Sequence, residues 1–184
     1  VALTGAGVCY VIFGKAVDFA ENVDLATFVF SASTGFKILG SDQGASLGMS
    51  VSGGFDFNDD GHSDVVVGSY NNPLDRLSGG AAYVIFGHPT EHAFAAVDSA
   101  DFVSSSSVGV MIVGGGSNTN LSCVFVASAG DVNNDGFDDI VSRSLLGYAA
   151  VVFGKGNADS ATRDLLQFPA NNMCYIEKSY LDSR

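Results

Sequence analysis

Two acidic, glycine-containing stretches of this chain have the residue types and the spacing of a metal-binding loop. They are DFNDDGHSD (56–64) and DVNNDGFDD (131–139), and both fit the pattern D-x-N-x-D-G-x-x-D. In such a loop, side chains at positions 1, 3, 5 and 9 and the backbone carbonyl at position 7 offer oxygen ligands, while glycine at position 6 permits the tight turn. With water, this makes about six or seven oxygen donors, which suits calcium better than octahedral magnesium. We therefore predict two Ca²⁺ sites.

The predicted ligands are the residues at these positions. In the first loop they are Asp56, Asn58, Asp60, the carbonyl of His62, and Asp64; in the second they are Asp131, Asn133, Asp135, the carbonyl of Phe137, and Asp139. Asp, Asn and Gly also favour ordinary turns, but a second copy with the same ligand set favours a metal site.

The loops are not EF-hands. An EF-hand has a bidentate Glu at position 12 between two helices, whereas position 12 is Val67 in one copy and Ser142 in the other. The residues that follow each loop, 65–67 and 140–141, are β-branched runs typical of buried strands. Each loop is therefore expected to join two strands.

The composition indicates a folded, acidic protein. Of 184 residues, 47% are apolar and 15% are charged, and the formal net charge is -12. This charge disfavours nucleic acid and anionic membrane surfaces as partners and favours cations. No apolar run approaches the roughly 20 residues of a membrane helix. Three cysteines without a C-x-x-C pair leave the redox compartment open.

Motifs recur along the chain at a spacing of about seventy residues. YVIFG occurs at 10–14 and 83–87, followed by AVVFG at 150–154; GFKILG (35–40) recurs as GVMIVG (109–114), and VDLATF (from Val23) as VDSADF (from Val97) and RDLLQF (from Arg163). Each period holds four short apolar runs between turn residues, which predicts a small four-stranded sheet. In the segment between YVIFG and the next repeated run, we expect one helical turn, at 23–28 and 97–102.

The order of these motifs resembles the FG-GAP repeats of integrin alpha-subunit propellers and related surface proteins. Leu47, Gly48, Ser50 and Val51 match the opening strand of a repeat, and the metal loop and VVVGSY (65–70) follow. Ser69 and Tyr70 replace the Ala and Pro of the family's turn. The second copy departs further, with Ser122 and Cys123 at its start and IVSRS (140–144) lacking the glycine.

The resemblance implies an all-β fold of β-propeller-type blades, each with four antiparallel strands. We predict the last strands of a first blade at 1–45, a complete blade at 46–115, and a second blade at 116–184 whose final strand, near Met173–Glu177, is degenerate. This is about two and a half blades, whereas closed propellers use roughly four to eight. We therefore expect an incomplete ring whose ends need a partner, either another subunit or the remainder of a longer chain.

No catalytic set is evident, and we predict no catalytic residues, no organic cofactor and no enzyme activity. GASLG (44–48) fits the G-x-S-x-G elbow of hydrolases, but it leads into a predicted strand and not into the helix that an elbow needs. The sequence favours a calcium-binding module for protein–protein interaction, adhesion or scaffolding, extracellular or at the cell surface, without membrane insertion. Alternatives are the propeller part of a larger secreted, phospholipase-like hydrolase and a carbohydrate-binding propeller.

Overall fold

Short strands dominate the structure, a computed structural model that describes residues 3–15, 22–70, 80–89, 96–103, 108–113, 123–143, 149–156, 162–164 and 175–177. In this part of the chain there are twelve β-strands and one short 3-10 helix. The prediction of an all-β fold is therefore confirmed. Cys9 and Cys123 are both free thiols.

The strands are three to six residues long. Their bounds are β1 Val8–Ile12, β2 Gly35–Leu39, β3 Ser50–Phe55, β4 Asp64–Ser69, β5 Ala81–Ile85, β6 Ala96–Asp98, β7 Gly109–Val113, β8 Phe125–Gly130, β9 Asp139–Arg143, β10 Ala149–Val152, β11 Thr162–Asp164 and β12 Tyr175–Glu177. The 3-10 helix η2, Ser99–Val103, follows β6 directly.

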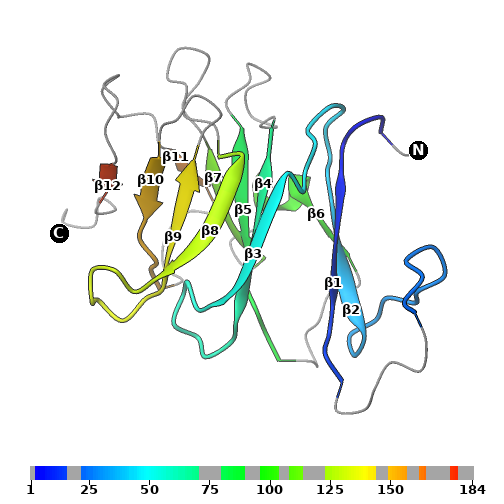
Figure 1. The fold of residues 1–184 in the computed structure, drawn as a ribbon, viewed down its shortest axis with the longest axis horizontal. Coiled ribbons are helices and arrows are strands. Elements are labelled where there is room, and N and C mark those ends of the chain that lie inside the picture. The colour runs from blue at the N-terminus through cyan, green and yellow to red at the C-terminus, as the bar shows by residue number, and fades with distance from the viewer. Residues whose placement is uncertain are drawn as a thin grey trace.

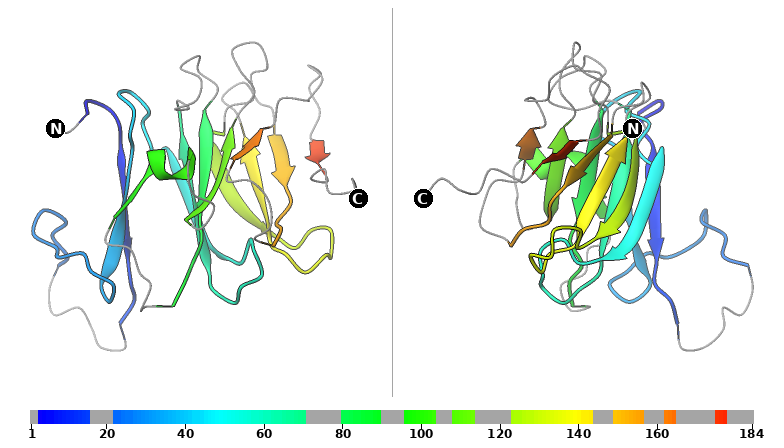
Figure 2. Two further views of the ribbon diagram at one scale, coloured as in Figure 1. Left: turned by 180° about the vertical axis from the view of Figure 1, so that it is seen from behind. Right: turned by 60° about the vertical axis from the view of Figure 1, so that its left-hand side comes forward.

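The strands form three sheets. Their strand orders are β1-β2-β6, β11-β7-β5-β4-β3 and β12-β10-β9-β8. In the middle sheet, β3, β4, β5 and β7 are successive antiparallel neighbours. The three sheets stand in a row, with β3 of the middle sheet beside β8 of the next (Figure 1), and the turned views show the same succession (Figure 2). In the described part of the chain, this is the arrangement of propeller blades in an open row.

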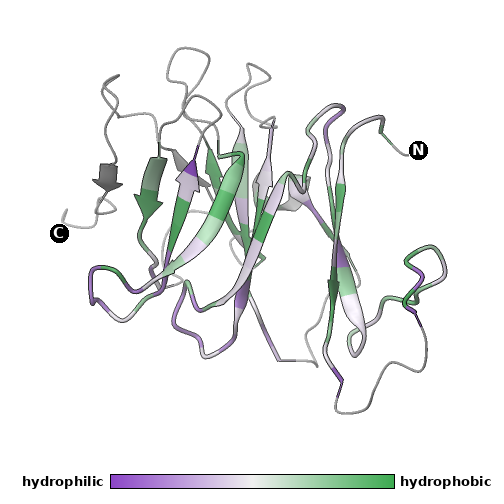
Figure 3. Cartoon of the chain, viewed as in Figure 1, coloured by the Kyte–Doolittle hydropathy of each residue, from purple (hydrophilic) through white to green (hydrophobic). Residues whose placement is uncertain are grey.

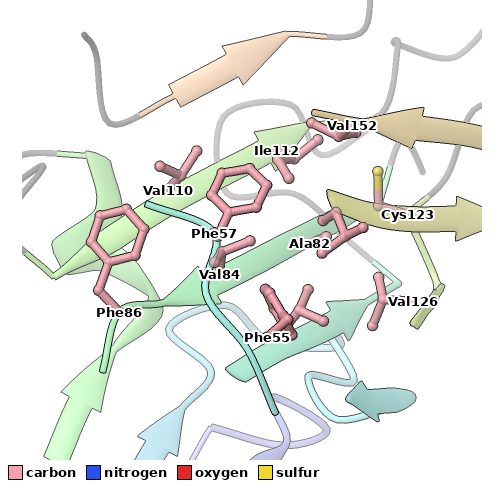
Figure 4. Close-up of a cluster of buried hydrophobic side chains, with 12 residues drawn as sticks. Phe55, Phe57, Ala82, Val84, Phe86, Val110, Ile112, Cys123, Val126 and Val152 are labelled. Carbon is pink, nitrogen blue, oxygen red and sulfur yellow. The ribbon is translucent and has the colours of Figure 1, made fainter. Parts of the chain in front are cut away.

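The repeated apolar run explains why the middle sheet is covered on both faces. All five residues of β5 are buried, and because side chains alternate along a strand they enter two different cores. Ala82 and Val84 face the core shared with the β8-β9-β10 sheet, whereas Tyr83 and Ile85 face the core shared with the β1-β2 sheet. Figure 4 shows the first core, in which Ala82 and Val84 lie with aromatic residues of the β3 end. A run that is buried on both faces reads as continuously apolar.

One feature of the sheets differs from the sequence analysis. The helical turn predicted at 97–102 is present as η2, but a strand that was not predicted, β6, comes before it. β6 pairs in parallel with β2 of the preceding sheet, and β11 pairs with β7 in the same way. Each of these two sheets therefore gains a strand from the next period. The earlier copy, at 23–28, forms a turn in which the Phe28 N–H donates to the Asp24 carbonyl.

The final strand, β12, lies inside the segment predicted for it. It pairs with β10 in parallel, whereas its counterpart β7 pairs with β5 antiparallel. The degenerate sequence of this strand therefore goes with a different direction of pairing. The division at 1–45, 46–115 and 116–184 stays a prediction, since β6 and β11 join sheets formed by earlier segments.

Candidate metal centre

The two predicted metal loops join antiparallel strands, as expected. The first connects β3 to β4 and the second connects β8 to β9. A β-bulge precedes each loop, between Gly53 and Phe55 in the first copy and between Ser128 and Gly130 in the second. A bulge bends and twists its strand, so both copies turn into the loop with the same local irregularity. Figure 3 shows both loops as largely hydrophilic turns at the same edge of the sheets.

Position 1 of each loop organises the turn. The Asp56 carboxylate accepts hydrogen bonds from the N–H groups of Asp60 (3.1 Å) and Gly61 (2.8 Å). Asp131 accepts the same two bonds from Asp135 and Gly136, at 3.0 and 2.9 Å. The glycine has a positive φ in both copies, 84° and 95°, which explains why position 6 is Gly.

Position 4 also has the left-handed conformation. Its φ is 54° at Asp59 and 58° at Asn134. Asp and Asn tolerate this region better than most residues with a side chain. The two loops therefore share their backbone path as well as their sequence pattern.

Positions 3 and 5 bring their side chains together. Asn58 Nδ2 donates to Asp60 Oδ2 at 2.8 Å, and Asn133 Nδ2 donates to Asp135 Oδ2 at 2.7 Å. The other oxygen of each Asp accepts the N–H of position 7, from His62 at 2.9 Å and from Phe137 at 3.0 Å. The predicted role of the carbonyls of position 7 stays a prediction.

Position 9 ties each loop to the sheet. Asp64 is fully buried, and its carboxylate accepts the N–H of Phe57 (2.7 Å) and the N–H of Gly87 (2.7 Å). Burial raises the pKa of the Asp64 carboxyl to about 7, while these two hydrogen bonds act in the opposite direction. Asp139 is likewise fully buried, and burial raises its pKa. It accepts the N–H groups of Val132 and Gly154, at 2.9 and 2.8 Å.

The glycine that ends each F-G pair contacts the metal loop. A Cβ at Gly87 would clash with the carbonyl oxygen of Ser63, and a Cβ at Gly154 would clash with that of Asp138. The sequence analysis noted the repeated F-G pair but did not assign it to the loop. The spacing from position 9 gives no constant signal, because Gly87 follows Asp64 by 23 residues in one copy and Gly154 follows Asp139 by 15 in the other. Only the F-G pair itself, which ends the repeated apolar run in both copies, could have pointed to this contact.

The two loops also contact each other. The Asp56 N–H donates to Asp138 Oδ2 at 2.9 Å, and the Asp138 N–H donates to the Asp56 carbonyl at 3.0 Å. The Lys155 N–H donates to the Phe57 carbonyl at 2.8 Å. Asp138 was not among the predicted site residues, and no repeat pattern marks it, because the first loop has Ser63 at this position.

The structure brings the predicted ligands into two separate loops, but it does not gather their carboxylates around one point. Within the described residues, no group of three or more His, Cys, Asp or Glu side chains is placed to hold a metal ion. The carboxylates instead accept backbone N–H groups. Each carboxylate oxygen that accepts one N–H retains a second lone pair, so the donor set remains suited to a hard cation.

The G-x-S-x-G match is not a nucleophile elbow. GASLG (44–48) leads into β3, whereas an elbow leads from a strand into a helix.

Among the described residues, no helix has the length and hydropathy for crossing a bilayer.

Comparison with family models gives a match for part of the chain. Residues 47–85 match the model of the FG-GAP repeat. The match begins just before β3 and ends with the last residue of β5, so it contains the first metal loop and the strands on both sides of it. No curated protein matches the chain.

Proposed function

We propose, from the FG-GAP repeat that this chain carries, that it is a calcium-binding, blade-forming module for protein–protein interaction, adhesion or scaffolding, and that it is not an enzyme. The observation that carries the calcium assignment is the matching hydrogen-bond frame of the two loops. In both copies, position 1 accepts the N–H groups of positions 5 and 6, and the side chains of positions 3 and 5 are in contact. Ordinary turns do not require this set of oxygen-bearing side chains twice.

A calcium ion would be held by the oxygens of positions 1, 3, 5 and 9 and the carbonyl of position 7. Its chemistry at this place is structural, because it would neutralise the carboxylates of the loop and hold the turn. Position 9 would connect the ion to the sheet, since Asp64 and Asp139 are anchored to the F-G glycines. The same side chains would thereby link the loop, its strands and the metal.

We place the module outside the cell or at the cell surface. Calcium sites of extracellular modules bind at about 0.1 to 1 mM, and open loops with a few carboxylates fit that class better than a high-affinity cytosolic buffer. Partner binding is supported by the three sheets, which form blades but close no ring in the described structure. The partner would be another subunit or further polypeptide.

Isothermal titration calorimetry tests the calcium assignment. We expect two bound Ca²⁺ ions per chain, and Asp60→Asn should reduce the number to one. Asp59→Asn is the matched control: it removes one charge from the same loop at a position that is not a predicted ligand, and the second loop has Asn134 there. A stoichiometry of zero, with the loops ordered, would refute the calcium assignment. If both variants lost one bound Ca²⁺ ion, the loss would depend on the net charge of the loop and not on a ligand at position 5.

A further inference from the structure

A reciprocal pair of hydrogen bonds joins the two metal loops. The Asp56 N–H donates to Asp138 Oδ2 at 2.9 Å, and the Asp138 N–H donates to the Asp56 carbonyl at 3.0 Å. Asp138 therefore holds both backbone polar groups of position 1 of the first loop. The Asp56 carboxylate in turn accepts the N–H groups of positions 5 and 6 of its own loop. A residue of the second loop thus holds the residue that organises the first.

Asp138 stands between two predicted ligands of its own loop. It occupies position 8, with the Phe137 carbonyl at position 7 before it and Asp139 at position 9 after it. Asp139 is fixed to the sheet, because its buried carboxylate accepts the Gly154 N–H at 2.8 Å. Ligation by positions 7 and 9 would therefore restrict the backbone of Asp138 as well.

A second connection between the loops runs through the residues that follow β10. The Gly154 N–H donates to Asp139, and the Lys155 N–H donates to the Phe57 carbonyl at 2.8 Å. In the first loop, the Phe57 N–H donates to Asp64 Oδ2 at 2.7 Å. The position 9 residues of both loops are thus linked through one short chain of backbone groups.

The contact between the loops is closely packed. A Cβ at Gly154 would clash with the carbonyl oxygens of both Asp138 and Phe57. At position 2, Phe57 of the first loop is 0% exposed, whereas Val132 of the second loop is 50% exposed. The opening residues of the first loop therefore lie against the second loop and the residues after β10. Because such packing leaves little free space, a change in the order of one loop acts on the other.

We propose that Asp138 is a positioning residue for the first calcium site and that it makes the two sites bind calcium with positive cooperativity. The inference rests on the proposed calcium function and describes how its two sites regulate each other. Filling the second loop fixes position 8, and Asp138 then holds Asp56 in place before the first loop is filled. The first loop loses less conformational freedom on binding, so its affinity rises. The coupling is reciprocal, as linkage requires.

The sign of the coupling separates positioning from a plain effect of charge. Two bound dications repel each other, so charge alone would make the second ion bind more weakly than the first. Positive cooperativity instead requires that one filled loop order the other. We expect a coupling factor of about five, at the low end of the range that is usual for coupled sites.

Calorimetric titration of the whole chain with Ca²⁺ measures this factor. Asp60→Ala and Asp135→Ala each leave one site, and their association constants describe the two loops singly. The factor is the product of the two constants of the unaltered chain divided by the product of these single-site constants. The same set of measurements with Asp138→Ala in every chain should give a factor of about one or less. Any effect of the removed ligand charges is common to both sets and cancels.

Two matched variants identify what Asp138 contributes. Asp138→Asn removes the charge but keeps an oxygen that accepts the Asp56 N–H, and it should retain the cooperativity. Ser63→Ala changes the same position of the first loop and should also retain it. An equal loss of cooperativity in Asp138→Asn and Asp138→Ala would overturn the positioning role, because charge and not the hydrogen bond would then couple the loops.

Hydrogen exchange followed by NMR tests the coupling without any change at Asp138. In the Asp60→Ala chain, which fills only the second loop, calcium should slow the exchange of the Asp56 amide. An unchanged exchange rate in saturating calcium would overturn the proposal. Two ions that bind independently would also overturn it and leave the calcium assignment standing, whereas a chain that binds no calcium would refute both.

Discussion

Ser50 shows how one small side chain connects two sheets. Its hydroxyl donates to the Val124 carbonyl at 2.7 Å and accepts the Val126 N–H at 2.8 Å. Both partners belong to the segment that enters the third sheet. The sequence analysis matched Ser50 to the opening strand of the repeat, and the structure gives the physical reason for a serine there.

Removing this hydroxyl should therefore destabilise the chain. We expect Ser50→Ala to lower the free energy of unfolding by about 1 to 3 kcal/mol, because the Val126 N–H and the Val124 carbonyl would lose their partner between the sheets. Urea denaturation measures the change. Ser33→Ala, at an exposed turn, is the control and should have little effect. Equal midpoints for Ser50→Ala and the unaltered chain would show that water replaces the hydroxyl.

The middle and third sheets carry different residues at matching places in the repeat. In the middle sheet these places face the third sheet. In the β3–β4 pair, Ser50 lies opposite Gly68; in the β8–β9 pair, Phe125 lies opposite Arg143. A Cβ at Gly68 would clash with the Val124 carbonyl, so glycine permits the close approach of the third sheet. In the third sheet the Arg143 guanidinium lies 5.3 Å from the centre of the Phe125 ring. That face therefore cannot receive another sheet at the same short distance.

Gly68 gives a direct test of this close packing. We expect Gly68→Ala to destabilise the chain by about 1 to 3 kcal/mol, because the added methyl group forces the third sheet away from the middle sheet. Thermal unfolding followed by circular dichroism measures it. Gly14→Ala is the matched control, since a Cβ at Gly14 meets no atom within 4 Å. A neutral Gly68→Ala would mean that the two sheets separate without cost.

Calcium at the two proposed sites would affect the stability of the entire chain, whose net charge is -12. Calcium that binds only the folded state stabilises it by mass action, about 2.7 kcal/mol per site at a concentration 100 times the Kd. We expect calcium to raise the Tm and a chelator to lower it. Asp135→Ala should remove the part of the calcium-dependent rise in Tm that comes from the second loop and leave the part that comes from the first. Identical melting curves in calcium and in chelator, at equal ionic strength, would identify both loops as ordinary turns.

Exposed apolar side chains are concentrated at the end of the molecule that contains β1. Of the eleven large hydrophobic residues that are exposed in the described structure, six lie between Leu3 and Val29. We expect the isolated chain to bind an apolar dye and to associate in light scattering, because such a surface favours contact. Replacing Tyr10 and Val51 together by Ser should reduce dye binding. A monomer that binds no dye would show that the ends of the row of sheets cover themselves.

The sequence by itself determined the all-β class, the strands around both metal loops and the FG-GAP repeat. These features depend on local chemistry: β-branched runs favour strands, and only Gly, Asp and Asn readily take the positive φ that the loops require at positions 4 and 6. The repeat made each local signal visible more than once. The predicted ligand positions follow from this same spacing.

Only the tertiary structure decided how the periods interlock. β6 and β11 pair with the preceding sheet, Asp64 and Asp139 bond to the F-G glycines, and Asp138 contacts the first loop. Each of these contacts joins residues that are far apart in the chain, and the same short polar or apolar segment would suit several neighbours. Which neighbour it meets depends on how neighbouring sheets pack face to face. β1 and β5 are the clearest case, because they carry the same YVIFG run, yet among the described strands β5 lies between β4 and β7 whereas β1 pairs with β2.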